Sequence, residues 1–220
     1  MKFFLDSAMT DEIQYALDMW NIDGVTTNPR HVLVSGKPFL KVVTEIAEIF
    51  AGTDKPISVE VNPHLDDWTE MVKEGKQLAA MSPNFVIKLP ATEAGFKAVF
   101  ELAADGIKSN LTLVFSPAQA LQAMRMGAAF VSPFIGWKEA NGEEVTHFID
   151  EVTTIRNTYG FETEIIVAAA RDARQIVNSA VSGADIVTAG MAVFKDAFDH
   201  PYTDVGLGKF QGFWDETTYE

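Results

Sequence analysis

The chain has 220 residues, 47% of them hydrophobic, and no linker rich in Ser, Pro or Gly, so we expect a single domain with a sizeable core over residues 1–220. Its formal charge of −14 argues against nucleic acid or an anionic membrane as a partner. The absence of cysteine excludes disulfides, thiolate metal sites and cysteine nucleophiles. Because the sequence contains neither a signal-peptide pattern nor an apolar run of membrane length, the cytoplasm is the expected location.

Apolar and β-branched segments alternate with amphipathic patterns along the chain. In chain order, the expected strands are residues 1–7, 24–28, 57–62, 84–89, 110–115, 130–135, 164–169 and 184–189. A helical pattern follows each strand, at residues 10–20, 38–51, 68–78, 94–103, 117–126, 144–159, from 173 onward and 191–198. Eight such units in this length predict an α/β fold, a closed (β/α)8 or TIM barrel, with residues 203–220 as a C-terminal helix or tail. An open doubly wound sheet is the alternative.

The fourth expected strand contains a lysine in an otherwise apolar run. Lys88 follows Phe85-Val86-Ile87 and precedes Leu89, and Pro90 ends the run. One interpretation is a lysine that extends its aliphatic stem along the strand end and keeps its amine in water. The other is a desolvated amine that attacks a carbonyl and forms a Schiff base.

The strands have one apolar and one polar face. In residues 57–62 and 110–115 the two kinds of side chain alternate, as expected for strands covered by helices on one side only. In a barrel the polar face would point inward. The polar side chains that would then converge are Asp6, Asn28, Glu60, Lys88, Asn110 and Thr112. All lie toward the carboxyl ends of their strands, where barrel enzymes carry their active sites, so this set favours the catalytic interpretation of Lys88.

At these residues the chain resembles the transaldolase family, in particular the small branch shared with fructose-6-phosphate aldolase. The segments that carry the resemblance are 4–7 (FLDS), 24–29 (GVTTNP), 59–61 (VEV), 86–90 (VIKLP), 110–116 (NLTLVFS), 132–136 (SPFIG) and 200–204 (HPYTD). The resemblance implies a (β/α)8 barrel and a Schiff-base lysine that works without metal or organic cofactor. It also implies transfer of a dihydroxyacetone unit between sugar phosphates, as in the pentose phosphate pathway.

By the matching motifs, the Schiff-base lysine is Lys88, the acid/base aspartate is Asp6, and Glu60 holds the catalytic water together with Thr112. The resemblance further implies four residues that bind substrate or line the pocket, namely Asn28, Asn110, Ser132 and Phe134. This chemistry suits the residue types, because a carboxylate must take the proton of the C4 hydroxyl when the C3–C4 bond breaks.

Three functions remain open. The first is transaldolase, and the second is fructose-6-phosphate aldolase. By resemblance, the aldolase members differ from this chain at two positions, with glutamine in place of Glu60 and tyrosine in place of Phe134. Both residues therefore side with transaldolase, since a phenyl ring cannot help to protonate the enamine. The third is a barrel without turnover that binds sugar phosphates.

The expected phosphate site departs from the family pattern. Family members usually have an arginine where this chain has Trp137, and a Ser-x-Arg segment where it has Ala169-Ala170-Arg171. Arg171 is therefore the expected phosphate ligand, and the further candidates are Arg30 and Lys138, each adjacent to a matched motif. Trp137 could instead stack on an unphosphorylated sugar or an altered acceptor.

Two further features concern metals and assembly. The histidines at positions 31, 64, 147 and 200 form no i,i+4 pair, so we expect most of them to be surface or loop residues and no zinc site. The tail is rich in aromatic residues, which suits docking over a neighbouring subunit or the pocket mouth, or a contact within the chain. The resemblance implies a homo-oligomer built from rings, commonly a decamer, in which the last helix reaches a neighbour.

Overall fold

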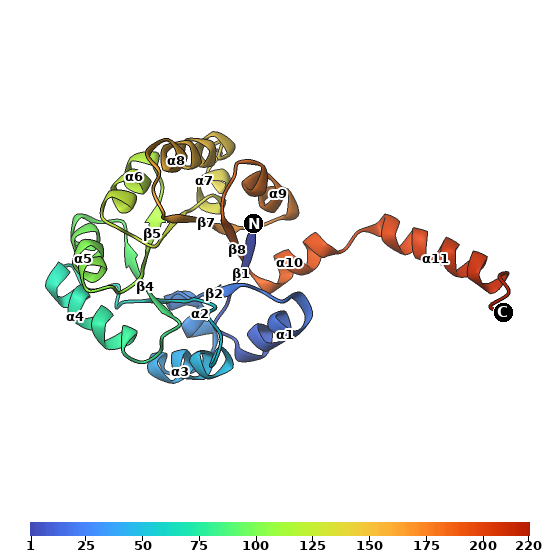
Figure 1. The fold of residues 1–220 in the computed structure, drawn as a ribbon, viewed down its shortest axis with the longest axis horizontal. Coiled ribbons are helices and arrows are strands. Elements are labelled where there is room, and N and C mark those ends of the chain that lie inside the picture. Colours follow the sequence, from blue (N-terminus) through green and yellow to red (C-terminus); the bar gives the residue numbers. More distant parts are fainter.

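The computed structural model describes all 220 residues and contains a closed barrel of eight parallel strands in the order β1 to β8, with β1 paired with β8 (Figure 1). The strands are Lys2–Asp6 (β1), Gly24–Thr26 (β2), Ile57–Glu60 (β3), Phe85–Pro90 (β4), Ser109–Val114 (β5), Phe130–Pro133 (β6), Glu164–Ala170 (β7) and Ile186–Ala189 (β8). The predicted (β/α)8 barrel is confirmed, and the open-sheet alternative is wrong.

Helices surround the barrel (Figure 1). They are Thr10–Trp20 (α1), Pro29–Val34 (α2), Phe39–Ile49 (α3), Trp68–Ala79 (α4), Glu93–Ala104 (α5), Pro117–Arg125 (α6), Gly136–Ala140 (α7), Thr146–Tyr159 (α8), Ala173–Val181 (α9) and Met191–Phe198 (α10), and a further helix, Pro201–Asp215 (α11), follows them at the C-terminus. The short helices α2 and α7 were not predicted. Helix α2 forms because the Asn28 side chain accepts a hydrogen bond from the backbone N–H of His31, and Pro29 suits a first helical turn.

The predicted orientation of the two strand faces is confirmed. Leu5, Val59 and Ile87 are fully buried in the main core of 41 residues, which lies between strands and helices. The opposite face points into the barrel. A Cβ at Gly24 would lie 2.7 Å from the ring of Phe4, so glycine leaves room for that ring inside the barrel.

The interior of the barrel is apolar in one layer and polar in the next. The apolar layer is a separate cluster formed by Phe4, Val86, Phe130, Ile166 and Ile186. Two residues further along the same strands, and therefore on the same face, come the polar residues Asp6, Lys88, Ser132 and Thr188, with Ala168 on β7. The apolar layer closes the barrel beneath these polar groups, so the polar site opens only toward the carboxyl ends of the strands.

Two strands carry a bulge near their carboxyl ends. The register of β5 shifts between Leu111 and Val114, and that of β7 shifts between Val167 and Ala170. Leu113 and Ala169, within these shifts, have positive φ angles of 58° and 60°. The left-handed conformation is unfavourable for residues other than glycine, and such strain concentrates at functional sites.

Helix α11 lies apart from the barrel (Figure 1). None of its residues is buried, and the side chain of His200 caps its N-terminus ahead of Pro201. Its large exposed apolar residues are Tyr202, Val205, Leu207, Phe210, Phe213 and Trp214. A helix with this much exposed aromatic surface has no partner within its own chain. No helix of the protein is both long enough and apolar enough to cross a bilayer.

Candidate active site

Lys88 is buried inside the barrel. Its residue surface is only 4% exposed, its Nζ donates a hydrogen bond to the carbonyl oxygen of Thr27 at 3.0 Å, and Nζ lies 3.4 Å from Oε2 of Glu60. An amine that reached water along the strand end would be exposed, so that interpretation is wrong. The structure places a desolvated amine beside a carboxylate, which is an arrangement suited to a nucleophilic lysine.

Asp6 lies at the end of β1 with a donor at each oxygen. Thr26 Oγ1 donates to Oδ1 at 2.7 Å, and Nε2 of His31 lies 3.1 Å from Oδ2. Burial raises the pKa of Asp6, but the contact with His31, the charges of His31 and Lys88 and the Thr26 hydroxyl together hold that pKa below its ordinary value. Asp6 is therefore a carboxylate, the form that can accept a proton.

Glu60 on β3 is paired with Lys88, and Thr112 lies on β5, the strand on the other side of β4, where it is paired with Pro90. Oγ1 of Thr112 is buried and has no hydrogen-bond partner within the protein. Buried hydroxyls are nearly always paired, so this hydroxyl is available to a water or a substrate group. The carboxylate of Glu60 and the hydroxyl of Thr112 are suited to holding one water near the lysine.

Asn110, which is paired with Lys88 across β4 and β5, hydrogen-bonds to two neighbouring serine side chains. It is fully buried, donates from Nδ2 to Ser58 Oγ at 3.0 Å, and accepts at Oδ1 from Ser132 Oγ at 2.7 Å. Its side chain does not line the cavity above Lys88, whereas Ser132 and Phe134 do. Asn110 therefore does not line the substrate cavity as the resemblance implies. It instead fixes the hydroxyl of Ser132, which does line it.

A cavity of about 530 Å³ opens at the carboxyl ends of the strands. Apart from Asn110, it is lined by every predicted site residue, namely Asp6, Asn28, Glu60, Lys88, Thr112, Ser132, Phe134 and Arg171. The Asn28 side chain uses its oxygen to cap α2, and its amide nitrogen makes no hydrogen bond within the protein. The cavity thus combines a nucleophile, a carboxylate base and free polar groups.

Two arginines on the cavity wall have no charged partner. Arg30 and Arg171 line the cavity, and no ion pair of the protein involves either of them. A Cβ at Gly136 would lie 2.1 Å from the carbonyl oxygen of Ala169 and 3.0 Å from Nε of Arg171, so only glycine permits this close packing. The surface ion pair that could have explained Arg171 is absent, and its guanidinium is free for an anion.

Trp137 belongs to an aromatic wall beside Arg171. Its ring lies 5.9 Å from the ring of Phe115 and 5.7 Å from that of Phe134, in the second case edge to face. Trp137 is nevertheless 53% exposed and lines the cavity. The position that usually carries a second cation is thus occupied by a rigid apolar surface.

Most of the histidines were expected at the surface or in loops, and His31, whose side chain is 23% exposed, is an exception. Its ring lines the cavity and contacts Asp6, because α2 starts directly after the Thr-Thr-Asn-Pro segment and turns its first residues inward. The signal in the sequence was its position three residues after the capping residue Asn28. No group of three or more His, Asp or Glu residues has an arrangement that could hold a metal ion.

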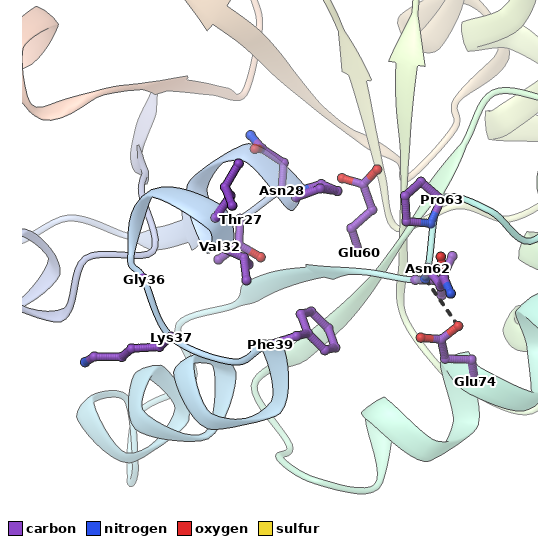
Figure 2. A pocket seen from close by; sticks show the side chains of 13 residues that line it. Thr27, Asn28, Val32, Gly36, Lys37, Phe39, Glu60, Asn62, Pro63 and Glu74 are labelled. Carbon is purple, nitrogen blue, oxygen red and sulfur yellow. Dashed lines mark hydrogen bonds between the residues drawn. The ribbon is translucent and has the colours of Figure 1, made fainter.

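A second cavity, of about 630 Å³, shares Asn28, Pro29 and Glu60 with the first (Figure 2). Figure 2 shows Asn28 and Glu60 at its upper edge and Phe39 below, with a hydrogen bond from the backbone N–H of Asn62 to Glu74. Lys88 and Asp6 do not line this cavity. We therefore assign the chemistry to the first cavity and regard Glu60 as part of the wall between the two.

Comparison with known proteins places these features in a family. The family model for transaldolase/fructose-6-phosphate aldolase matches residues 3–217. The chain is 55% identical over 221 aligned positions to the 6-deoxy-6-sulfo-D-fructose transaldolases of Priestia aryabhattai and Priestia megaterium, covering 100% of this chain and 98% of each relative. It is 44% identical to a probable transaldolase of Aquifex aeolicus, covering 98% and 97% of the two chains.

Proposed function

Because the chain belongs to the transaldolase/fructose-6-phosphate aldolase family and is a transaldolase, we propose that it transfers a dihydroxyacetone unit from 6-deoxy-6-sulfo-D-fructose to an aldose phosphate. The single observation that carries the choice of donor is the free guanidinium of Arg171, which lies where the family pattern has a further arginine and a serine that this chain lacks. The 55% identical relatives bear the name of that donor.

In the proposed reaction, Nζ of Lys88 attacks C2 of the ketose, and loss of water gives an iminium. Asp6 takes the proton of the C4 hydroxyl, the C3–C4 bond breaks, and its electrons pass to the iminium to form an enamine. Carbons 4 to 6 leave as a three-carbon hydroxyaldehyde that keeps the sulfonate. The enamine then attacks the acceptor aldehyde, Asp6 returns the proton, and a water held by Glu60 and Thr112 hydrolyses the new iminium.

The charge of the donor tail supports a sulfonate. A phosphate monoester carries about −1.5 to −2 charges at neutral pH, whereas a sulfonate carries one. Arginine and serine ligands at the positions of Trp137 and Ala169 would suit the larger charge, and this chain has neither. The guanidinium of Arg171 can pair with the single charge of a sulfonate, and the indole of Trp137 can pack against the carbon to which the sulfonate is attached. A sulfonated donor would also place the enzyme outside the pentose phosphate pathway that the resemblance implied.

A comparison of donors tests the proposal. Transfer to erythrose 4-phosphate gives the same seven-carbon product from 6-deoxy-6-sulfo-D-fructose and from fructose 6-phosphate, so a single assay measures both. We expect kcat/KM to be higher for the sulfonated donor by about tenfold or more, corresponding to about 1.4 kcal/mol. A preference for fructose 6-phosphate would contradict the choice of donor and leave the transaldolase chemistry standing.

The same assay without acceptor addresses the aldolase alternative. Phe134 packs against Phe115 and Trp137 and has no hydroxyl with which to protonate the enamine. We therefore propose that the enamine waits for an acceptor aldehyde. Release of free dihydroxyacetone at the rate of transfer would instead assign the chain to the aldolases.

We further propose that the enzyme forms a homo-oligomer in which α11 packs on a neighbouring subunit. This helix has no buried residue, and it exposes Phe210, Phe213 and Trp214 by 61–70%. Replacing these three residues together by serine is expected to lower the mass measured by light scattering, in the limit to the 24.2 kDa of one chain. Circular dichroism should remain that of a folded barrel.

The matched control is Val181→Ser, which removes an apolar side chain that is 83% exposed on α9 of the barrel. We expect this variant to keep the wild-type mass. A wild-type protein that is monomeric at micromolar concentration, or an unchanged mass in the triple variant, would refute the role of α11.

A further inference from the structure

The only basic side chain in direct contact with Asp6 is that of His31. Resting on the proposed function, we propose that His31 is the positioning residue of Asp6 during cleavage of the C3–C4 bond. Its Nε2 fixes Oδ2 and keeps the carboxyl group charged, so that Asp6 can take the proton of the C4 hydroxyl. No motif that carries the family resemblance includes this histidine.

The local structure holds the imidazole in place. His31 lies in the first turn of α2, where its backbone N–H donates to Oδ1 of Asn28 at 3.0 Å. Its side chain is 23% exposed and lines the cavity. The capping bond thus ties the position of His31 to Asn28, which lines the same cavity. A single short helix presents a polar amide to the substrate and an imidazole to the base.

The hydrogen-bonding capacity of Asp6 leaves room for the substrate. Each carboxylate oxygen accepts about two hydrogen bonds, and each already has one neighbouring donor, Thr26 on one side and His31 on the other. A lone pair therefore remains on each oxygen for the C4 hydroxyl. The hydroxyl of Thr26 also contacts that of Thr188 at 2.6 Å, so Thr26 is itself fixed.

Charge explains why a histidine is needed. Burial of Asp6 favours the neutral carboxylic acid, which cannot accept a proton. His31 opposes this effect through its contact and its positive charge, and Lys88 adds a second charge from further away. The remaining charged groups on the cavity wall are Arg30 on α2, Glu60 on β3 and Arg171 after β7. The charge on the Lys88 nitrogen is lost when the iminium becomes the enamine, whereas His31 and Thr26 stay in contact with Asp6.

Every proton and electron pair that moves in cleavage and condensation is accounted for. In cleavage, the C4 hydroxyl proton moves to Asp6, the C3–C4 electron pair moves to C3 and the iminium, and the aldehyde leaves. In condensation, the enamine forms the new C–C bond, and the proton returns from Asp6 to the new hydroxyl oxygen. His31 takes no part in the proton transfer itself and acts only through Asp6.

The test compares His31→Leu with His31→Gln. Loss of His31 raises the pKa of Asp6, and the active carboxylate is lost as pH falls through that pKa. The acid limb of kcat/KM for donor cleavage should therefore move to higher pH in His31→Leu, by about one unit or more. His31→Gln can still donate a hydrogen bond to Oδ2 but carries no charge, so its limb should lie between those of His31→Leu and the wild type.

Trapping with borohydride separates this proposal from the proposed function. In both variants the adduct of dihydroxyacetone on Lys88 should form as in the wild type, because Schiff-base formation does not use His31. The surface variant His147→Leu, whose side chain is 87% exposed, should leave the pH profile unchanged. An unshifted acid limb, or loss of the adduct in both His31 variants, would overturn the role of His31. Absence of the adduct in the wild type would instead refute the proposed function.

Discussion

A Lys88→Met variant is expected to lose transfer activity by about four orders of magnitude or more, the scale seen when a catalytic nucleophile is removed. Nζ of Lys88 is the only amine inside the barrel, held between Thr27 and Glu60 at 3.0 and 3.4 Å. Methionine has a similar length and an apolar stem but no nucleophile. Transfer kinetics and mass spectrometry after trapping with borohydride measure the two effects, and no adduct should form.

The control for this prediction is Lys76→Met. Lys76 lies on α4 and forms an ion pair with Asp105 at 2.7 Å, with both side chains about half exposed. Exposed pairs of this kind contribute little, so activity and adduct should equal those of the wild type. An adduct that persists in Lys88→Met would show that another amine is the nucleophile, and the assignment would then be wrong.

Thermal unfolding of Lys88→Met should distinguish loss of the nucleophile from loss of the folded protein. Removing the Lys88 amine leaves the carboxylate of Glu60, whose side chain is only 12% exposed, without its cation. Loss of one partner of a buried pair commonly costs about 3–5 kcal/mol. We therefore expect thermal unfolding at a lower temperature with a folded spectrum at 25 °C. Loss of activity in a protein that is still folded is the informative result.

The strand pattern was sufficient to predict the barrel interior, because alternate side chains of a strand must lie on opposite faces. This period placed Asp6, Glu60, Lys88 and Thr112 on one face without any knowledge of distances, and all four line one cavity. It could not predict the contact between His31 and Asp6. That contact depends on the direction of a six-residue helix, and so on packing rather than on periodicity.

The backbone of β5 and β7 contains a second feature that the sequence could not predict. Leu113 and Ala169 adopt positive φ angles that glycine, or at times asparagine, would normally signal. Nothing in their residue types indicated the bulges, which turn Leu113 and residues 168–170 toward the cavity. Surrounding structure imposes this conformation. The departures at Trp137 and Ala169 were visible in the sequence, but their meaning required the observation that Arg171 is unpaired.

Replacement of Arg171 by methionine is expected to raise KM for the sulfonated donor by about 10- to 150-fold, since a hydrogen bond to a charged group contributes about 1.5–3 kcal/mol. The guanidinium lines the cavity, has no ion pair and packs closely against Gly136. Its removal should therefore leave the rest of the site intact. A dihydroxyacetone adduct on Lys88, which involves no anionic tail, should form at the wild-type rate. Steady-state kinetics and borohydride trapping give the two values.

Arg30→Met is the matched control, because Arg30 is the other unpaired guanidinium on the cavity wall. If Arg171 holds the donor tail, Arg30→Met changes KM much less than Arg171→Met does. The reverse order would place the sulfonate beside α2 instead of beside Trp137. Arg171→Lys keeps the charge but loses the planar fork of donors, so a partial loss is expected there. A full loss in Arg171→Lys would mean that geometry governs recognition of the sulfonate more than charge does.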